Sequence, residues 1–192
     1  GLPRSAPDAQ AQTALAWQES AWPWTAYGPV VMAAVAAGVP VLGGNLPRSQ
    51  MRAAMADAAW DGHLPAAALS RQYAALREGH CGLLPESQIG PMARIQIARD
   101  AAMAQTAREA MRPGQAVLLV AGSGHVLRSI GVPTHWSANI KSKVVVAQAG
   151  KAQTATTLIA KDADAVVETP ALPPRDACAE LRQQWQRPAA AR

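Results

Sequence analysis

An apolar run that ends in a glycine turn and a histidine constrains this chain most. Residues 117–121 are Val-Leu-Leu-Val-Ala, and Gly122, Ser123, Gly124 and His125 follow at once. A continuous aliphatic run is typical of a buried parallel strand, and glycines let the backbone turn sharply after it. Open α/β sheets bind ligands at the carboxyl ends of their strands. The sequence therefore predicts a buried strand that presents His125 at a binding edge, although the same turn would also suit a solvated histidine without a ligand.

The composition is that of a globular protein without a nucleic-acid surface. Of the 192 residues, 49% are hydrophobic and 16% are charged, which a packed core requires and a disordered chain lacks. The formal net charge is +5, but the arginines that supply most of it are spread over several segments, and the chain has two Tyr and no Phe. Proteins that bind nucleic acids usually cluster their charge and their stacking rings. We therefore expect an anionic small ligand rather than a nucleic acid.

The order of the expected elements indicates an α/β protein. Strands alternating with helices favour a mainly parallel sheet flanked by helices, and three consecutive helices suggest a helical insertion. We predict a sheet domain of residues 1–45 and 115–192 and a smaller all-helical subdomain of residues 46–114. The expected strands are 39–42, 116–121, 143–148 and 165–168, and the expected helices are 12–20, 30–37, 47–58, 66–77, 86–111, 126–130 and 176–186.

The longest expected helix carries a polar stripe. Gln96, Arg99 and Asp100 lie between Met92 and Met103 at spacings that place all five on one helical face. Buried charges normally have structural partners, so the simpler interpretation is a pair of Arg99 and Asp100 that satisfies buried backbone or a neighbouring helix end. The functional alternative is that this stripe faces the edge of the sheet near His125.

A histidine, two tyrosines and two lysines are further candidates for ligand contact: His80, Tyr27, Tyr73, Lys141 and Lys143. The His80 imidazole, in a loop flanked by glycines, could donate a hydrogen bond to an anion. A tyrosinate can ligate ferric haem iron, and a lysine could reach a carboxylate. Each of these residue types is also common as a structural tyrosine, a surface histidine or a solvated lysine.

The two cysteines and the remaining histidines carry less information. Cys81 and Cys178 lie far apart without metal-ligand spacing, and they could form a disulfide in an oxidising compartment or stay as thiols in the cytosol. His63 and His135 have no supporting pattern and are expected to be structural. Ser123 lacks the sequence of a nucleophile elbow, so serine catalysis is not predicted.

Several motifs, taken in order, resemble those of a known family. They span about residues 15 to 180 and are similar to the ChaN family of haem-binding lipoproteins, within a superfamily that includes the Tiki proteases and erythromycin esterases. The resemblance implies a large parallel sheet and a smaller helical domain. The motifs are WPWTAYGP at 22–29, GNLPR at 44–48, HCGLLP at 80–85, MARIQIARDAAMA at 92–104, GSGH at 122–125, GVP at 131–133 and DAC at 176–178.

The resemblance also implies haem uptake by a homodimer. In the haem-binding example of the family, paired haems lie face to face between two subunits. A tyrosine of one subunit ligates each iron, and a histidine and a lysine of the other hold the propionates. The residues implied for this site are Tyr27 or Tyr73 as the iron ligand, His80 or secondly His125, and Lys141 or Lys143, at the propionates. From the stripe on the long helix, Gln96 and Arg99 are added as candidate cofactor-binding residues.

The compartment and the partners also follow from the resemblance. A protein of this family is expected in the periplasm or at the outer membrane, held by a lipid anchor that this chain does not contain, with an outer-membrane haem receptor as a candidate partner. That compartment predicts a disulfide between Cys81 and Cys178.

Family members begin with a strand that ends in an L-G-E-x-H type motif, and we expect that strand to be missing here because no such motif occurs. Superfamily hydrolases use the upstream Glu and His, so an enzyme is the less favoured interpretation. The alternatives are a metal-dependent hydrolase that uses His125 and a scaffold with an incomplete site.

Overall fold

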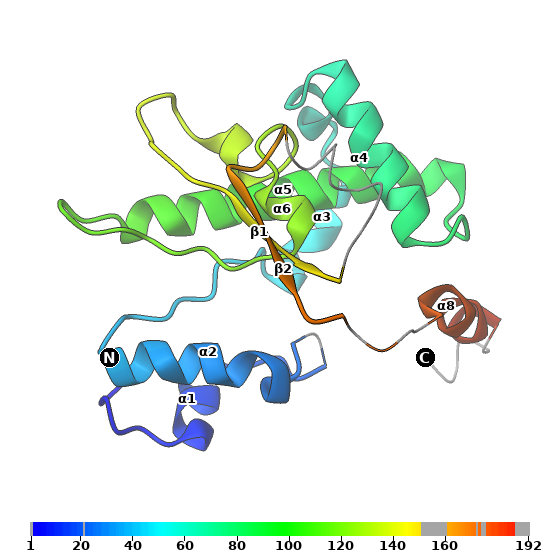
Figure 1. Cartoon of the computed structure of the whole chain (residues 1–192). Helices are drawn as coiled ribbons and strands as arrows, with labels where there is room; N and C mark the ends of the chain where they lie inside the picture. Colours follow the sequence, from blue (N-terminus) through cyan, green and yellow to red (C-terminus); the bar gives the residue numbers. More distant parts are fainter. Residues whose placement is uncertain (1, 21, 151–160, 172, 174–175, 187–192) are drawn as a thin grey trace. The chain divides into compact units, whose positions relative to one another are not determined.

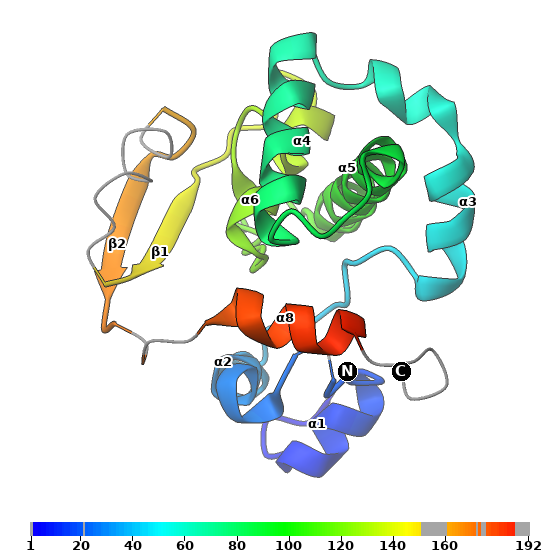
Figure 2. The same cartoon turned by 90° about the vertical axis from the view of Figure 1, so that its right-hand side faces the viewer.

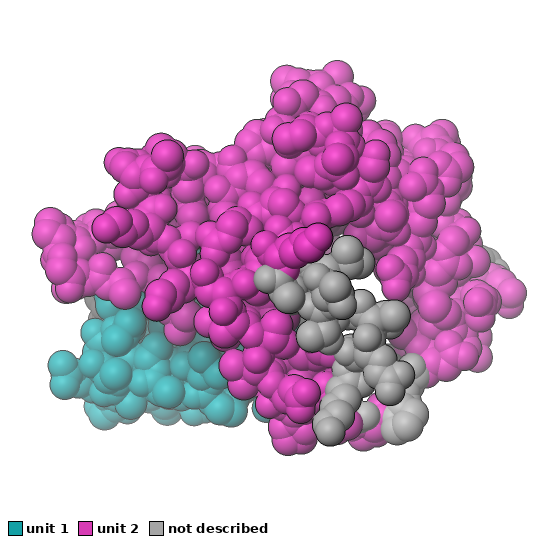
Figure 3. Space-filling view, turned by 45° about the horizontal axis from the view of Figure 1, so that its top comes forward, with its two compact units in different colours: residues 1–44 teal, residues 45–192 magenta. Residues whose placement is uncertain are grey.

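The fold is described from a computed structural model (Figure 1), which covers residues 2–20, 22–150, 161–171, 173 and 176–186. The chain divides into two compact units, residues 1–44 and residues 45–192, which are coloured separately in Figure 3. Each unit is described by itself. Within the residues covered, no helix is both long enough and apolar enough to cross a membrane.

The first unit contains helices α1 (Asp8–Ala14) and α2 (Trp24–Ala37). Val31 and Val35, one turn apart on α2, are buried and form the core of this unit with Ala6. The helix expected at 12–20 is displaced toward the N-terminus as α1, whereas the helix expected at 30–37 lies inside α2, which begins earlier and ends at the expected residue. Pro29 lies inside α2, where it removes one hydrogen bond without ending the helix. The helix ends at Gly38, whose φ of 72° is a left-handed conformation that glycine adopts without steric cost.

Helix α5 (Glu86–Ala110) organises the second unit. Helices α3 (Met51–Ala56) and α4 (Ala66–Gly79) pack against it, and Figure 2, which looks along α5, shows both beside it. Helices 66–77 and 86–111 are thus confirmed as α4 and α5. The expected helix 47–58 is instead a 3₁₀ turn at Arg48–Gln50 followed by the short α3.

Two strands of the second unit pair in parallel: β1 (Val145–Ala149) and β2 (Ala165–Thr169), with Val145 opposite Ala165. They confirm the strands expected at 143–148 and 165–168. Val146 is buried on one face of this pair, whereas Val145 and Val167 are about half exposed on the other. The described part of the chain therefore contains a small parallel sheet in a largely helical structure.

The strands expected at 39–42 and 116–121 do not form. Residues 116–121 run in an extended course from the end of α5 toward α6 (Ser123–Val126), as Figure 1 shows. The prediction of burial was wrong for Leu118 and Val120, whose exposed fractions are 84% and 56%. An apolar sequence favours a strand, but a strand also needs a neighbour with which to form hydrogen bonds, and no described residue pairs with this segment.

Short elements complete the second unit. Helix α6 precedes the expected 126–130 position, and a 3₁₀ turn follows at Val132–His135. Helix α8 (Ala177–Gln186) confirms the last expected helix.

Candidate functional site

His125 is held by a buried carboxylate. The His125 side chain is 18% exposed, and its Nδ1 lies 2.6 Å from Oδ1 of Asp100, a residue of α5 whose side chain is 3% exposed. An ionised carboxylate only accepts hydrogen bonds, so Nδ1 carries the proton in this pair and Nε2 is the nitrogen left for a ligand. The stripe on α5 therefore does reach His125, through Asp100.

Burial dominates the electrostatics of Asp100. It raises the pKa of the Asp100 carboxyl, because the charged form loses its hydration, while the hydrogen bond from His125 and the charge of Arg99 act in the opposite direction. The pair is thus a partly exposed imidazole whose orientation is fixed by an acid inside the protein. Such an imidazole can donate to, or accept from, a polar group at the surface.

Gly131 makes the local backbone arrangement possible. Its N–H donates to the Leu127 carbonyl at 2.8 Å, and a Cβ at this position would lie 2.2 Å from the His125 carbonyl oxygen. No side chain fits there. The glycine that begins the GVP motif therefore serves the packing of the loop that carries His125.

Arg99 and Gln96 form a separate polar group on α5. Arg99 Nε donates to Asn45 Oδ1 at 2.9 Å, and its Nη1 donates to Gln96 Oε1 at 3.2 Å. The ion pair expected between Arg99 and Asp100 is absent among the described residues, because each has a different hydrogen-bond partner. Asn45 thus holds the Arg99 guanidinium from outside α5.

Tyr73 lies on α4, and His80 is the residue that directly follows the end of this helix. The Tyr73 ring packs against a cluster that includes Leu76 and Ile89. In the described structure its hydroxyl has no hydrogen-bond partner. The His80 ring donates through Nδ1 to the Leu76 carbonyl at 2.8 Å, so its Nε2 is available to a ligand.

Two arginines lie close enough to Tyr73 to interact with it electrostatically. The hydrogen bond to Glu86 is the main cause that raises the pKa of Arg77, and Tyr73 adds to that rise. The pKa of Arg94 is also raised, chiefly by the hydrogen bond to Asp61 and to a smaller extent by Tyr73. The Tyr73 phenol therefore lies near two guanidinium groups, each of which is paired with a carboxylate.

The residue after His80 is fixed by a covalent link. Cys81 forms a disulfide with Cys178 of α8, with a Cα–Cα distance of 5.6 Å. The bond confirms the predicted pairing, and it joins the C-terminal end of α4 to the first turn of α8. His80 is thus adjacent to a fixed point of the second unit.

The remaining predicted residues stand apart from these groups. Tyr27 belongs to the first unit, is 36% exposed, and has its ring centroid 4.4 Å from that of Trp22. Lys141 and Lys143 are exposed on the segment that precedes β1. Lys143 helps to lower the pKa of Asp164, for which the hydrogen bond from the Val144 N–H is the main cause.

A stacked pair of histidines could not be predicted from the sequence. The rings of His63 and His135 lie 3.9 Å apart and nearly parallel, and His63 Nε2 is 3.0 Å from Thr134 Oγ1. Burial, and secondly the charge of His63, lower the pKa of His135 to about 4. These residues are 72 positions apart in the sequence and share no motif, so only the fold reveals the contact. No group of three or more metal-ligating side chains gathers anywhere in the described residues.

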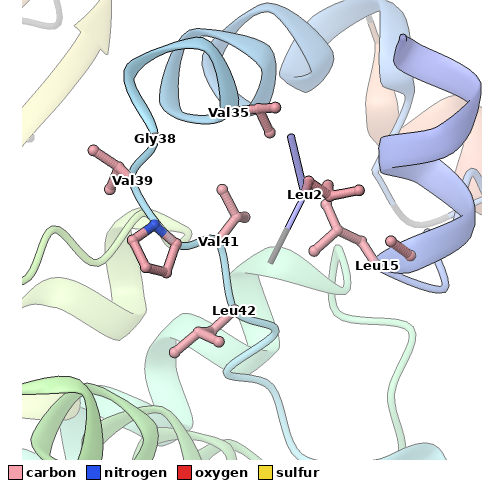
Figure 4. A pocket seen from close by; sticks show the side chains of 9 residues that line it. Leu2, Leu15, Val35, Gly38, Val39, Val41 and Leu42 are labelled. Carbon is pink, nitrogen blue, oxygen red and sulfur yellow. The ribbon is translucent and has the colours of Figure 1, made fainter. Parts of the chain in front are cut away.

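A cavity of about 460 Å³ lies in the first unit (Figure 4). It contains none of the predicted site residues. Its lining offers no polar side chain to orient a ligand, so we do not assign the site to it. The lining residues are Leu2, Ala14, Leu15, Val35, Gly38, Val39, Pro40, Val41 and Leu42.

Comparison with protein families gives one match, to the family described as "Haem-binding uptake, Tiki superfamily, ChaN", over residues 4–135. The protein belongs to the ChaN family. The matched region includes both tyrosines, His80, Asp100 and His125, but it ends before Lys141 and Lys143. No curated protein matches the chain.

A solved member of the ChaN family has a similar fold. It is ChaN of Campylobacter jejuni, whose structure is described as showing cofacial haem binding. The two are 25% identical with a TM-score of 0.64, and the match covers 83% of this chain and 62% of that one. The chain thus spans less than two thirds of the length of this ChaN.

Proposed function

We propose that this protein binds haem in a bacterial haem or iron uptake system, with Tyr73 as the iron ligand. Membership of the ChaN family and the fold shared with a haem-binding ChaN support the choice of ligand. The observation that carries the choice of residue is that Tyr73 is half-buried, with its ring packed against the core, while its hydroxyl has no hydrogen-bond partner among the described residues.

Tyr73 is placed where a ligand could reach its phenol. A phenol ligates ferric iron as tyrosinate. Arg77 and Arg94 lie near it, and each guanidinium is held by a carboxylate, that of Glu86 and that of Asp61. Tyr27 is the alternative ligand, but its described neighbour is the Trp22 ring rather than a cation.

The propionates need donors that are anchored yet accessible. His80 meets this requirement, because the Leu76 carbonyl fixes its ring and leaves Nε2 free to donate when the ring is protonated. In a homodimer that encloses paired haems, the His80 of one subunit would serve the haem ligated by Tyr73 of the other. His125 can bind a carboxylate in the same manner through its own Nε2, and Lys141 or Lys143 would add an exposed ammonium group.

The disulfide supports an oxidising compartment. Structural disulfides persist in the periplasm and outside the cell, whereas cytosolic thiols are kept reduced. The Cys81–Cys178 bond therefore favours a periplasmic or outer-membrane location, in which an outer-membrane haem receptor is a suitable partner.

Titration of the purified protein with hemin tests the proposal. Ferric haem held by a tyrosinate should give a high-spin absorption spectrum that saturates at one haem per chain. We expect Tyr73→Phe to abolish this spectrum and Tyr27→Phe, the matched control, to retain it. The reverse result would assign Tyr27, and a wild-type protein without any spectral change would refute haem binding.

A second candidate function rests on Asp100 and His125. A buried acid that orients an imidazole is the arrangement used for general-base catalysis or for metal ligation, as in hydrolases. Metal analysis of the protein purified from cells would test this candidate. Stoichiometric zinc or manganese that is lost in His125→Ala would favour it, and metal-free protein would oppose it.

A further inference from the structure

We propose that Gly90 of α5 controls ligand access to the Tyr73 hydroxyl, because a large side chain at this position would cover the phenol oxygen. The inference rests on the proposed function, in which Tyr73 ligates the haem iron. A Cβ at Gly90 would lie 3.9 Å from Tyr73 Oη. Apart from the adjacent residues and the α5 backbone, no other described atom would lie within 4 Å of it.

The packing of α4 against α5 places Gly90 opposite Tyr73. Near the turn between the two helices, the Arg77 guanidinium donates two hydrogen bonds of 2.8 Å to the Glu86 carboxylate. Tyr73 lies one turn before Arg77 on α4, and Gly90 lies one turn after Glu86 on α5. The same pairing of helix faces that joins Arg77 to Glu86 therefore brings Tyr73 to Gly90.

The Tyr73 ring is fixed in this position by the core. It packs against a cluster that includes Leu76 and Ile89, whose exposed fractions are 5% and 2%. Ile89 directly precedes Gly90, so the cluster that holds the ring also fixes α5 at the glycine. The size of residue 90 therefore controls the space beside the phenol oxygen.

Side chains of different size would act differently at position 90. At 3.9 Å, the methyl group of an alanine would make an ordinary van der Waals contact with Tyr73 Oη and leave the oxygen within reach. A leucine side chain extends two bonds beyond its Cβ and would lie over the oxygen. Haem is wide and planar, and its iron would have to bond to this same oxygen, so a covering side chain would exclude it.

Gly90 also has a local reason to lack a side chain. It precedes Pro91 inside α5, and the ring of a proline crowds the Cβ of the residue before it in a helix. Every substitution at Gly90 adds this cost to the helix. Gly90→Ala carries the same cost as Gly90→Leu but stops at the Cβ, so the two variants together separate the effect on the helix from the covering of Tyr73.

Acetylation of the tyrosine oxygen by N-acetylimidazole tests the proposal without haem. In a Tyr27→Phe background Tyr73 is the sole tyrosine, and peptide mass spectrometry measures its rate of modification. We expect Gly90→Leu to react at least about tenfold more slowly than Gly90→Ala, because the reagent reaches the oxygen only in molecules whose leucine has moved aside. The matched control is Gln88→Leu, the same side chain at an exposed position on another side of α5, which should react like the background.

Two outcomes concern the folding of the variants. Circular dichroism verifies that each variant is folded. If Gly90→Leu does not fold, Gly90→Val takes its place with a side chain one carbon shorter. Fast acetylation of the folded Gly90→Leu, equal slowing in Gly90→Ala, or a Tyr73 that does not react in the background protein would overturn the proposal.

Hemin titration in the otherwise wild-type chain separates this proposal from the proposed function. If Tyr73 ligates iron, Gly90→Leu should weaken haem binding at least about tenfold, whereas Gln88→Leu should not. Slow acetylation of Gly90→Leu together with unchanged haem binding would support the role of Gly90 and refute Tyr73 as the ligand. A wild-type protein that binds no haem would refute the proposed function, and the acetylation rates would still decide the role of Gly90.

Discussion

Asp100 Oδ1 accepts a hydrogen bond from His125 Nδ1 over 2.6 Å, across 25 residues of sequence. This bond joins the long helix α5 to the glycine turn and fixes which imidazole nitrogen faces outward. The Asp100 carboxylate is almost completely buried. The bond therefore affects both the stability of the fold and the orientation of the His125 ring. The bond links two motifs that the sequence presents separately.

Removing the Asp100 carboxylate should destabilise the fold. In Asp100→Ala, the His125 Nδ1–H loses its acceptor inside the protein, and we expect the free energy of unfolding to fall by about 1–3 kcal/mol. Asp100→Asn keeps an acceptor oxygen and should lose less. Urea unfolding at neutral pH measures both variants, and equal losses would contradict a role for the hydrogen bond.

Titration of Asp100 should make the free energy of unfolding depend on pH. Because burial raises its pKa above the ordinary value of 3.8, the folded state retains the carboxyl proton at pH values where the unfolded chain has released it. That contribution to stability is present below the unfolded pKa and is lost as the pH rises through the folded pKa. Unfolding measured across the acidic range should show this loss in the wild type and not in Asp100→Asn. If the stability of the two proteins varied with pH in parallel, Asp100 would not be the cause of the pH dependence.

Titration of His135 should change the stability of the protein with pH in the opposite direction to Asp100. Its pKa falls from 6.5 to about 4 on folding, so the neutral ring is stabilised in the folded state. The contribution is present above the unfolded pKa and is lost as the pH falls from 6.5 toward 4, by up to about 3 kcal/mol. His135→Phe retains a ring that can stack on His63 but does not titrate, so its stability should vary less over this range. Urea unfolding at several pH values gives the answer, and an unchanged slope would exclude His135 as the cause.

Reduction of the disulfide should destabilise the second unit. Cys81 and Cys178 close a long loop, and breaking such a link typically costs about 2–4 kcal/mol. The double variant Cys81→Ser/Cys178→Ser should match the reduced wild type and be insensitive to reductant. Urea unfolding with and without dithiothreitol, together with a thiol assay on the native protein, measures this. Two free thiols in the unreduced protein would contradict the bond.

Gly131→Ala should disturb the turn that carries His125. The added Cβ would overlap the His125 carbonyl, and relieving such an overlap typically costs about 1–3 kcal/mol. Gly124→Ala is the matched control, because a Cβ there meets no atom within 4 Å. Thermal unfolding of both variants should show a loss only at Gly131. A similar loss in both would mean that added side chains in this turn are harmful for another reason.

The helices were predicted better than the strands because their signals are local. α4, α5 and α8 follow from apolar periodicity and from the proline and glycine residues at their ends. Strand pairing instead depends on residues far apart in the sequence. The segments 143–148 and 165–168 pair as β1 and β2. Residues 116–121 have an equally apolar sequence but pair with no described residue.

The candidate site shows the same division. The polar stripe on α5 and the turn before His125 are visible in the sequence. The partner of Asp100 is not, because the sequence offers the adjacent Arg99 as a partner, whereas His125 is 25 residues away. The unpaired Tyr73 hydroxyl and the contact of His63 with His135 also depend on which helices pack together. The proposed roles of Tyr27, His80, Lys141 and Lys143 stay predictions for the experiments above.

By itself, the sequence determined the positions of the main helices, the resemblance to the ChaN family and, through that resemblance, the pairing of the two cysteines. Only the tertiary structure decided that Asp100 pairs with His125 and not with Arg99, and that Leu118 and Val120 lie exposed. The physical reason is range: helix propensity and chain breaks act over a few residues, whereas burial and hydrogen-bond partners depend on which distant segments pack together.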